Sequence, residues 1–161
     1  MRFAICELQN ETLYLRFNIE AMFEIQDLFG SIPKAFEALN KTNLRDTYKL
    51  AEILAQQGEL SRRYLGYDEG KMWTAKELIT AMQLKDIPVL QTAIVSALSD
   101  GMTEQDENKR IDKGLLELSK NKKIDETLIY YAAGRLGISV KDALFMSVSD
   151  FFNTLNRNGK K

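Results

Sequence analysis

The sequence has no histidine and a single cysteine, Cys6, among its 161 residues. Without histidine, the chain cannot build a Ser-His or Cys-His nucleophile pair or an imidazole zinc site. A lone cysteine forms no intramolecular disulfide, which fits a reducing compartment. Because free cysteine is usually buried, we expect Cys6 to be a buried or half-buried strand residue.

The chain also lacks an excess of either charge and any long apolar run. Its formal net charge is −1, and basic and acidic residues are interspersed, so there is no basic stripe of the kind that duplex-binding domains display. No apolar run approaches the ~20 residues that span a bilayer, and the N-terminus has no signal-peptide pattern. We therefore expect a cytosolic protein that contacts neither nucleic acid nor membrane.

Carboxylates are the catalytic groups that these absences leave available. The pairs and groups with suggestive spacing are Glu52 with Glu59, and Glu104, Asp106 and Glu107. Acid–base work requires burial or a fixed partner, and these residues lie in polar segments, so we expect a surface role. Arg62 and Arg63 are likewise expected to be a solvated surface pair. The sequence thus predicts no catalytic residue, no metal site and no cofactor: the protein is not an enzyme.

Apolar periodicity predicts a mainly α fold with a small N-terminal β-hairpin. Alternating apolar residues over 3–8 and 13–17, separated by Gln9-Asn10-Glu11, predict the two strands. We expect Leu13, Leu15 and Phe17 on the buried face of the hairpin.

Helix starts are marked by cap residues and helix ends by glycines. The predicted N-caps are Asn18, Ser31, Asn43, Thr74, Asp86, Ser139 and Ser147. Gly30, Gly58, Gly66 and Gly137 are predicted helix stops. A separate short helix is expected over 60–65, and Gly101 is expected to mark the end of the main body.

The same patterns divide the chain into four parts. Residues 1–100 form a main helical body with the N-terminal hairpin, and 101–123 form a polar linker in which residues 111–119 could be a short helix. Residues 124–157 form a short helical C-terminal module, and 158–161 a disordered tail.

Large apolar side chains gather in two places. Trp73 lies near Tyr64 and Tyr67 in the sequence and either seals the edge of the core or forms a contact patch. The C-terminal module is rich in aromatics although a module so small buries little apolar surface. It therefore either docks on the main body or offers apolar faces to another chain. The residues predicted to bind a partner are Tyr130, Tyr131, Leu136, Phe145, Phe151 and Phe152.

Two segments resemble the tail assembly chaperones of long-tailed phages and prophages. LYLRFNIEAMFEIQDLFG with SIPKAFEAL is similar to the opening of that family, a strand followed by a helix with a Leu-x-Gly-type stop. IYYAAGRLGISVKDALFMSVSDFFNTL resembles the C-terminal segment of the extended chaperone form. The chain departs from the family at Leu144-Phe145-Met146, where a Trp is common in relatives.

The resemblance implies a non-enzymatic chaperone. Such proteins bind the long, largely helical tape measure protein, keep its apolar stretches soluble and bring tail tube subunits to it. They act in the host cytoplasm, are absent from the mature virion, and here self-association through the main body is expected.

The alternative is a helical regulatory or DNA-associated protein of a mobile element. In that case residues 139–155 would be a helix-turn-helix unit. Five basic residues would then form one face and bind duplex in a salt-dependent way: Lys122, Lys123, Arg135, Lys141 and Arg157.

Overall fold

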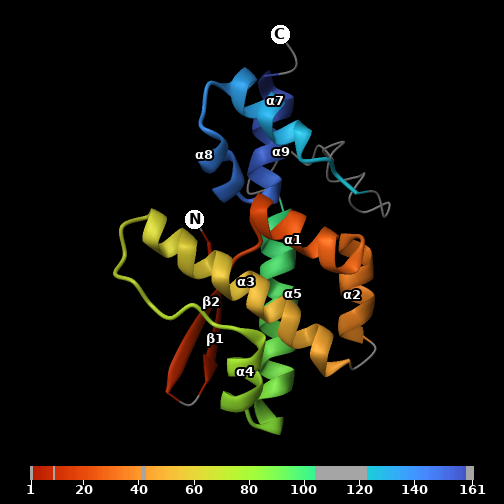
Figure 1. Ribbon diagram of the computed structural model, residues 1–161, viewed down its shortest axis with the longest axis vertical. Helices are drawn as coiled ribbons and strands as arrows, with labels where there is room; N and C mark the ends of the chain where they lie inside the picture. Colours follow the sequence, from red (N-terminus) through yellow and green to blue (C-terminus); the bar gives the residue numbers. More distant parts are fainter. Residues whose placement is uncertain (1, 9, 41–42, 104–122, 159–161) are drawn as a thin grey trace.

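The computed structural model describes residues 2–8, 10–40, 43–103 and 123–158, and these form a helical protein with one two-stranded antiparallel hairpin (Figure 1). The predicted fold class is therefore confirmed. The elements are β1 (Ala4–Leu8), β2 (Glu11–Leu15), α1 (Ile19–Phe29), α2 (Ile32–Asn40), α3 (Leu44–Tyr64), α4 (Ala75–Ala81), the 3₁₀ turn η1 (Leu84–Asp86), α5 (Ile87–Met102), α7 (Thr127–Leu136), α8 (Val140–Phe145) and α9 (Val148–Asn158).

The hairpin buries one face, as strand alternation requires. Cys6 lies opposite Leu13 and Ala4 opposite Leu15, and all four side chains are buried. The predictions for Cys6 and for Leu13 and Leu15 are confirmed. Phe17, just beyond β2, is buried as predicted too.

Two glycines that the sequence marks as helix ends lie inside helices. The chain stays helical through Gly58, so α3 continues to Tyr64 and no separate helix covers 60–65. Likewise α5 runs past Gly101 to Met102. A Cβ at Gly58 would overlap the carbonyl of Tyr14, and one at Gly101 would lie 2.5 Å from the oxygen of Phe17. Gly58 is required by close packing of α3 on β2, and Gly101 by close packing of α5 on Phe17 just beyond β2, not by the end of a helix.

Most predicted caps make the expected hydrogen bonds. Asn18 Oδ1 accepts from Ala21 N at 2.8 Å, and Thr74 Oγ1 accepts from Glu77 N at 3.2 Å. Asp86 differs. It precedes α5, but its carboxylate accepts from Gln83 N at 3.0 Å and so closes η1 rather than capping the helix that follows.

The C-terminal helices pack on the body and share its core. α9 contacts α5 and α1, and α8 contacts α1. Of the two outcomes left open by the sequence, docking on the main body is the one found. Residues 104–122 of the predicted linker, including the short helix over 111–119, and residues 159–161 of the predicted tail lie outside the described residues.

Candidate functional site: the surface of the C-terminal helices

Helix α7 exposes two adjacent tyrosines. Asp125 Oδ1 accepts from Thr127 N at its start, and Gly137 ends it with a left-handed φ of 70°. The core-facing side is formed by Ile129, Ala132 and Ala133. Tyr130 and Tyr131 therefore point outward and are 66% and 62% exposed.

Tyr131 is held by its own helix. Arg135 Nη1 donates to Tyr131 Oη at 3.2 Å. The two residues are four positions apart and therefore lie on the same face of the helix. Leu136, at the end of α7, is half-buried. Tyr130 and Tyr131 thus lie on the outer surface of α7, whereas Leu136 falls on the core-facing side with Ala132 and Ala133.

Phe145 joins α8 to the end of α3. Its ring stacks on Tyr64 with centroids 4.9 Å apart, and Tyr64 Oη donates to Asp142 Oδ1 at 2.6 Å. That hydrogen bond raises the pKa of Tyr64 and lowers that of Asp142. Phe145 is half-buried, so part of its ring remains at the surface.

Phe151 and Phe152 lie in the core. Their rings meet edge to face at 5.3 Å, and both are buried where α9 packs on the body. A partner cannot reach them while α9 is packed in this way. Their spacing with Val148, also buried, and half-buried Leu155 is that of an apolar helix stripe, and this signal favours core packing over surface contact.

The C-terminal segment is fixed to the body by hydrogen bonds to the backbone of Met146, Phe145 and Ile124. Ile19 N donates to Met146 O at 3.0 Å, and Arg16 Nη2 donates to Phe145 O at 3.2 Å. At the start of the same segment, the side-chain amide of Gln26 forms two hydrogen bonds with the backbone of Ile124. The buried polar residues Arg16 and Gln26 were not singled out in the sequence, because nothing in their local pattern distinguishes them from surface residues.

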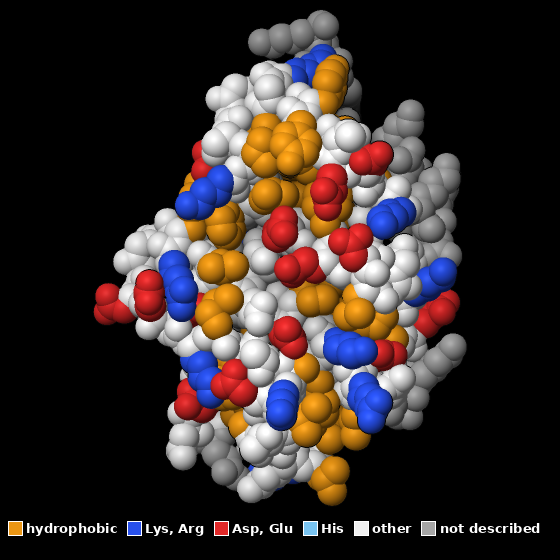
Figure 2. Space-filling view, viewed as in Figure 1, with side chains coloured by type: hydrophobic (Ala, Val, Ile, Leu, Met, Phe, Trp, Pro, Cys, Tyr) orange, Lys and Arg blue, Asp and Glu red, His pale blue; other side chains and the backbone are white. Residues whose placement is uncertain are grey.

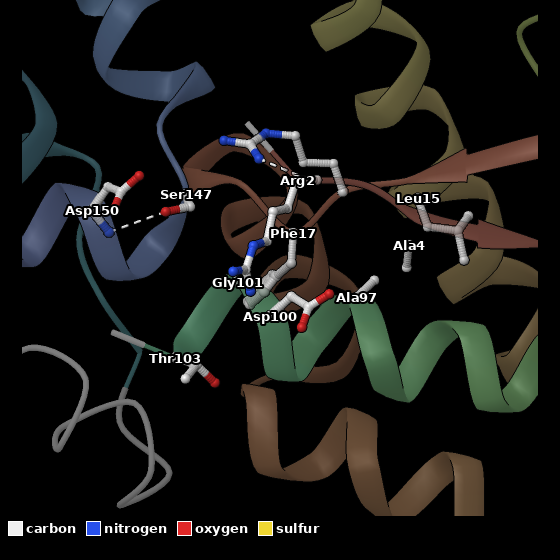
Figure 3. A pocket seen from close by; sticks show the side chains of 11 residues that line it. Arg2, Ala4, Leu15, Phe17, Ala97, Asp100, Gly101, Thr103, Ser147 and Asp150 are labelled. Atoms are coloured by element: carbon white, nitrogen blue, oxygen red, sulfur yellow. Dashed lines mark hydrogen bonds between the residues drawn. The ribbon is translucent and has the colours of Figure 1, made fainter. Parts of the chain in front are cut away.

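Arg16 borders a small cavity of about 70 Å³ between β2, the end of α5 and α9 (Figure 3). Asp100 and Asp150 also line it, and Arg16 Nη1 donates to Arg2 O at 3.1 Å. Burial lowers the pKa of the Arg16 guanidinium, and the charge of Asp150 opposes that shift. The buried cation therefore serves to join three chain segments.

A row of carboxylates lies along α1 next to the start of α7. Figure 2 shows acidic side chains gathered in the middle of the face, below a group of hydrophobic side chains over the C-terminal helices. Burial raises the pKa of Glu20, and the charges of Glu126 and Asp27 raise it further. Burial followed by the charge of Glu20 raises the pKa of Glu24 to about 6. Acidic side chains thus gather along α1 and at the start of α7.

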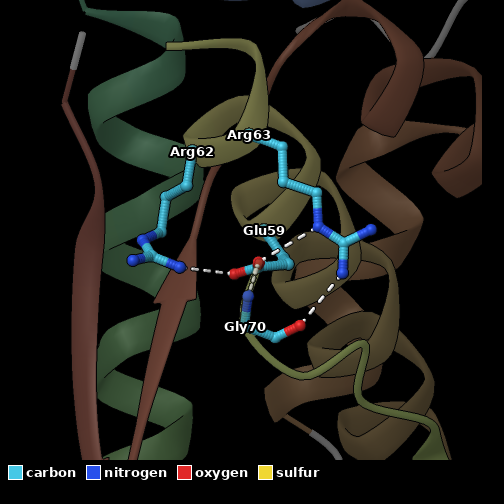
Figure 4. A network of polar contacts seen from close by, with 4 residues as sticks. All are labelled: Glu59, Arg62, Arg63 and Gly70. Atoms are coloured by element: carbon cyan, nitrogen blue, oxygen red, sulfur yellow. Dashed lines mark hydrogen bonds and ion pairs between the residues drawn. The ribbon is translucent and has the colours of Figure 1, made fainter. Parts of the chain in front are cut away.

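Glu52 and Glu59 have structural roles that the sequence did not predict. Glu59 is buried, and its carboxylate binds Arg62 Nη1 at 2.7 Å, Arg63 Nε at 3.2 Å and the N–H of Gly70 (Figure 4). Glu52 Oε2 accepts from Ala75 N at 2.7 Å. The expectation that these residues are solvated surface groups is wrong, because they hold the loop between α3 and α4 onto α3. Trp73, at the end of that loop, is buried, so it seals the core.

Other kinds of site find little support in the described part of the chain. It contains no group of three or more His, Cys, Asp or Glu placed to hold a metal ion, and Glu104, Asp106 and Glu107 lie outside it. None of its helices combines the length and apolar character needed to cross a membrane.

Two of the five basic residues of the alternative hypothesis make contacts with neighbouring side chains. Lys123 pairs with Asp27 at 3.3 Å, and Arg135 binds Tyr131. Lys122 lies outside the described residues. Comparison of the chain with family models, with curated proteins and with solved structures gives no match.

Proposed function

We propose that the protein is a non-enzymatic tail assembly chaperone of a long-tailed phage or prophage, which binds the tape measure protein and recruits tail tube subunits. The observation that carries the proposal is the pair of exposed tyrosines, Tyr130 and Tyr131, on a helix that is itself firmly docked. The pair lies within the segment that resembles the C-terminal part of the extended chaperones.

The tyrosine pair suits recognition of an apolar helix. Tyrosine combines a large apolar ring with a polar tip and loses little side-chain entropy on binding, and it is enriched among the residues that dominate protein interfaces. Fully burying one such ring contributes on the order of 1.5–3 kcal/mol. Two rings therefore supply about 3–6 kcal/mol, and a client held at micromolar strength also contacts the surface around the pair.

The docked arrangement gives the site a defined shape. α7 is held through Ile129, Ala132 and Ala133, and the segment before it through Gln26 and Ile124. A client therefore meets a preformed surface, which lowers the entropy lost on binding. We propose that the protein acts in the host cytoplasm and is absent from the mature virion.

Co-expression with a tape measure protein tests the proposal. The chain should increase the soluble yield of the tape measure protein, and Tyr130→Ser with Tyr131→Ser should abolish most of that increase. Tyr67→Ser is the matched control because Tyr67 is 59% exposed but lies outside α7. If the folded parent protein gave no increase, or if the control lost as much activity as the double variant, the proposal would be wrong.

A further inference from the structure

A second apolar surface lies at the far end of the molecule from α7. A groove of about 370 Å³ runs between the start of α3, the end of α4 and η1. Its apolar lining consists of Leu44, Tyr48, Ile79, Met82, Leu84 and Ile87. In Figure 1, α4 and α7 lie at opposite ends of the long axis, so this groove is separate from the tyrosine pair.

The groove exposes more apolar surface than its fold requires. Leu84 is 83% exposed and Ile79 50%, while Tyr48 is buried and forms part of the floor. Single exposed apolar side chains are ordinary on a protein surface, but several around one concavity mark an interaction site.

Leu84 is presented on a rigid turn. Asp86 Oδ2 accepts from Gln83 N at 3.0 Å and Asp86 N donates to Gln83 O at 2.9 Å, which closes η1 around Leu84. Pro88 follows as the second residue of α5, directly after the turn. An exposed side chain held in this way loses little freedom when a partner covers it.

Positive charge flanks the groove. Arg45 lines it, Lys49 lies exposed one helical turn further along α3, and Lys85 follows Leu84 on η1. Figure 2 shows Lys and Arg side chains on both sides of the hydrophobic side chains at the lower end of this face. The nearby acid Asp86 is already engaged with Gln83.

We propose that this groove binds an amphipathic helix of a partner protein whose apolar face is flanked by Asp and Glu. Apolar side chains at i, i+3 and i+4 of such a helix would contact Leu84, Ile79 and Leu44, as in other helix-in-groove complexes. Its acidic flanks would face Arg45, Lys49 and Lys85. This proposal uses neither Tyr130 nor Tyr131 and stands independently of the proposed function.

Two synthetic helices test it. Both have about five turns and the same leucine stripe, but one carries Glu and the other Lys on the flanks. Binding to the full chain is measured by fluorescence anisotropy at low and high salt. The Glu helix should bind with a Kd on the order of 10 µM and weaken with salt, and the Lys helix should bind about tenfold more weakly.

Variants locate the site. Ile79→Ser with Leu84→Ser should weaken binding of the Glu helix at least about tenfold, and Arg45→Glu with Lys85→Glu should reverse the preference between the two helices. Val95→Ser is the control, because Val95 is exposed on α5 outside the groove. Circular dichroism verifies that each variant is folded.

Three results would overturn the proposal. Equal binding of the two helices would show that Arg45, Lys49 and Lys85 do not select acidic flanks. Unchanged binding by the Ile79→Ser/Leu84→Ser variant would show that the helix binds outside the groove. Self-association of the chain alone that is lost in that variant would assign the groove to a second copy of the protein.

Discussion

Gly58 of α3 packs directly on the backbone carbonyl of Tyr14 in β2. A methyl group at Gly58 would overlap that oxygen, which belongs to the backbone and cannot move aside as a flexible side chain can. Nearby, Arg16 N donates to Leu54 O at 3.1 Å, so strand and helix are joined by a hydrogen bond as well as by packing. The hairpin lies close to α3 only because this position has no side chain.

Replacing Gly58 with Ala should destabilise the protein by about 3 kcal/mol, since overpacking against a fixed backbone costs 1–3 kcal/mol or more. Gly134→Ala is the matched control: Gly134 is also helical, and nothing lies within 4 Å of its added Cβ. That variant should be stabilised by up to about 1 kcal/mol, because alanine favours a helix over glycine. Urea denaturation measures both. Equal effects of the two substitutions would contradict the close packing at Gly58.

Arg16→Met should loosen the C-terminal helices more than the rest of the protein. The change removes the hydrogen bonds from Arg16 to the carbonyls of Phe145 and Arg2, and bonds to a charged group contribute roughly 1.5–3 kcal/mol. Because Arg16 Nε is buried and finds no acceptor among the described residues, the net loss should lie near the lower end of that range.

Hydrogen exchange followed by mass spectrometry distinguishes this outcome from general destabilisation. Peptides from α7, α8 and α9 should lose protection in the Arg16→Met variant before those from α3. Arg45→Met, at an exposed position on α3, serves as the control and should change neither. Uniform loss of protection across the chain would show that Arg16 does not specifically hold the C-terminal helices.

The local sequence rules located the elements because they depend on neighbouring residues. Asn18, Thr74 and Ser139 each cap the helix that they were expected to begin, and Gly30 and Gly137 each end one with positive φ. Caps and stops are properties of a few consecutive residues. The alternation of apolar residues likewise predicted the buried positions of Leu13 and Leu15 correctly.

The roles decided by distant residues could not be predicted in this way. Gly58 and Gly101 have the same sequence signature as a helix stop, and only the close approach of Tyr14 and of Phe17 shows their role. The local sequence around Glu59 predicts a surface carboxylate, and only the fold shows that Gly70 and two arginines bind it. The tyrosines of α7 were predicted to face a partner and are exposed. Phe151 and Phe152 were also predicted to face a partner, but their apolar stripe packs into the core of this same chain.

Cys6 should react with a thiol reagent only when the protein opens. Burial and, to a lesser extent, the charge of Asp86 raise the pKa of the Cys6 thiol to about 11. The reactive thiolate is therefore scarce at pH 8 even apart from the steric block. Labelling with an aromatic disulfide should be slow in buffer and fast in urea, and it should speed up in the Gly58→Ala variant. Rapid labelling of the native parent protein would contradict the burial of β1.

Glu24 should make the protein less stable as the pH rises through 6. Its pKa is raised to about 6 by burial first and by the charge of Glu20 next, with Gln57 opposing through a hydrogen bond and Glu52 and Asp27 adding smaller effects. In the unfolded chain the same carboxyl has a pKa near 4.5. The folded state therefore binds the proton more tightly, and this contribution to stability is fully present below pH 4.5 and lost as the pH rises past 6.

Glu24→Gln removes that dependence because the amide carries no charge at any pH. Relative to the parent protein, the variant should gain about 1 kcal/mol in unfolding free energy at pH 7.5, a value reduced from the full pKa difference because the carboxylate is partly exposed to solvent. At pH 4 the two proteins should be equally stable. Glu37→Gln on α2 is the control, because Glu37 is exposed to solvent and is not among the groups that shift the pKa of Glu24, and it should change little at either pH. Urea denaturation across this range gives the answer: a gap between Glu24→Gln and the parent that stays constant with pH would mean that the charge on Glu24 is not its cause.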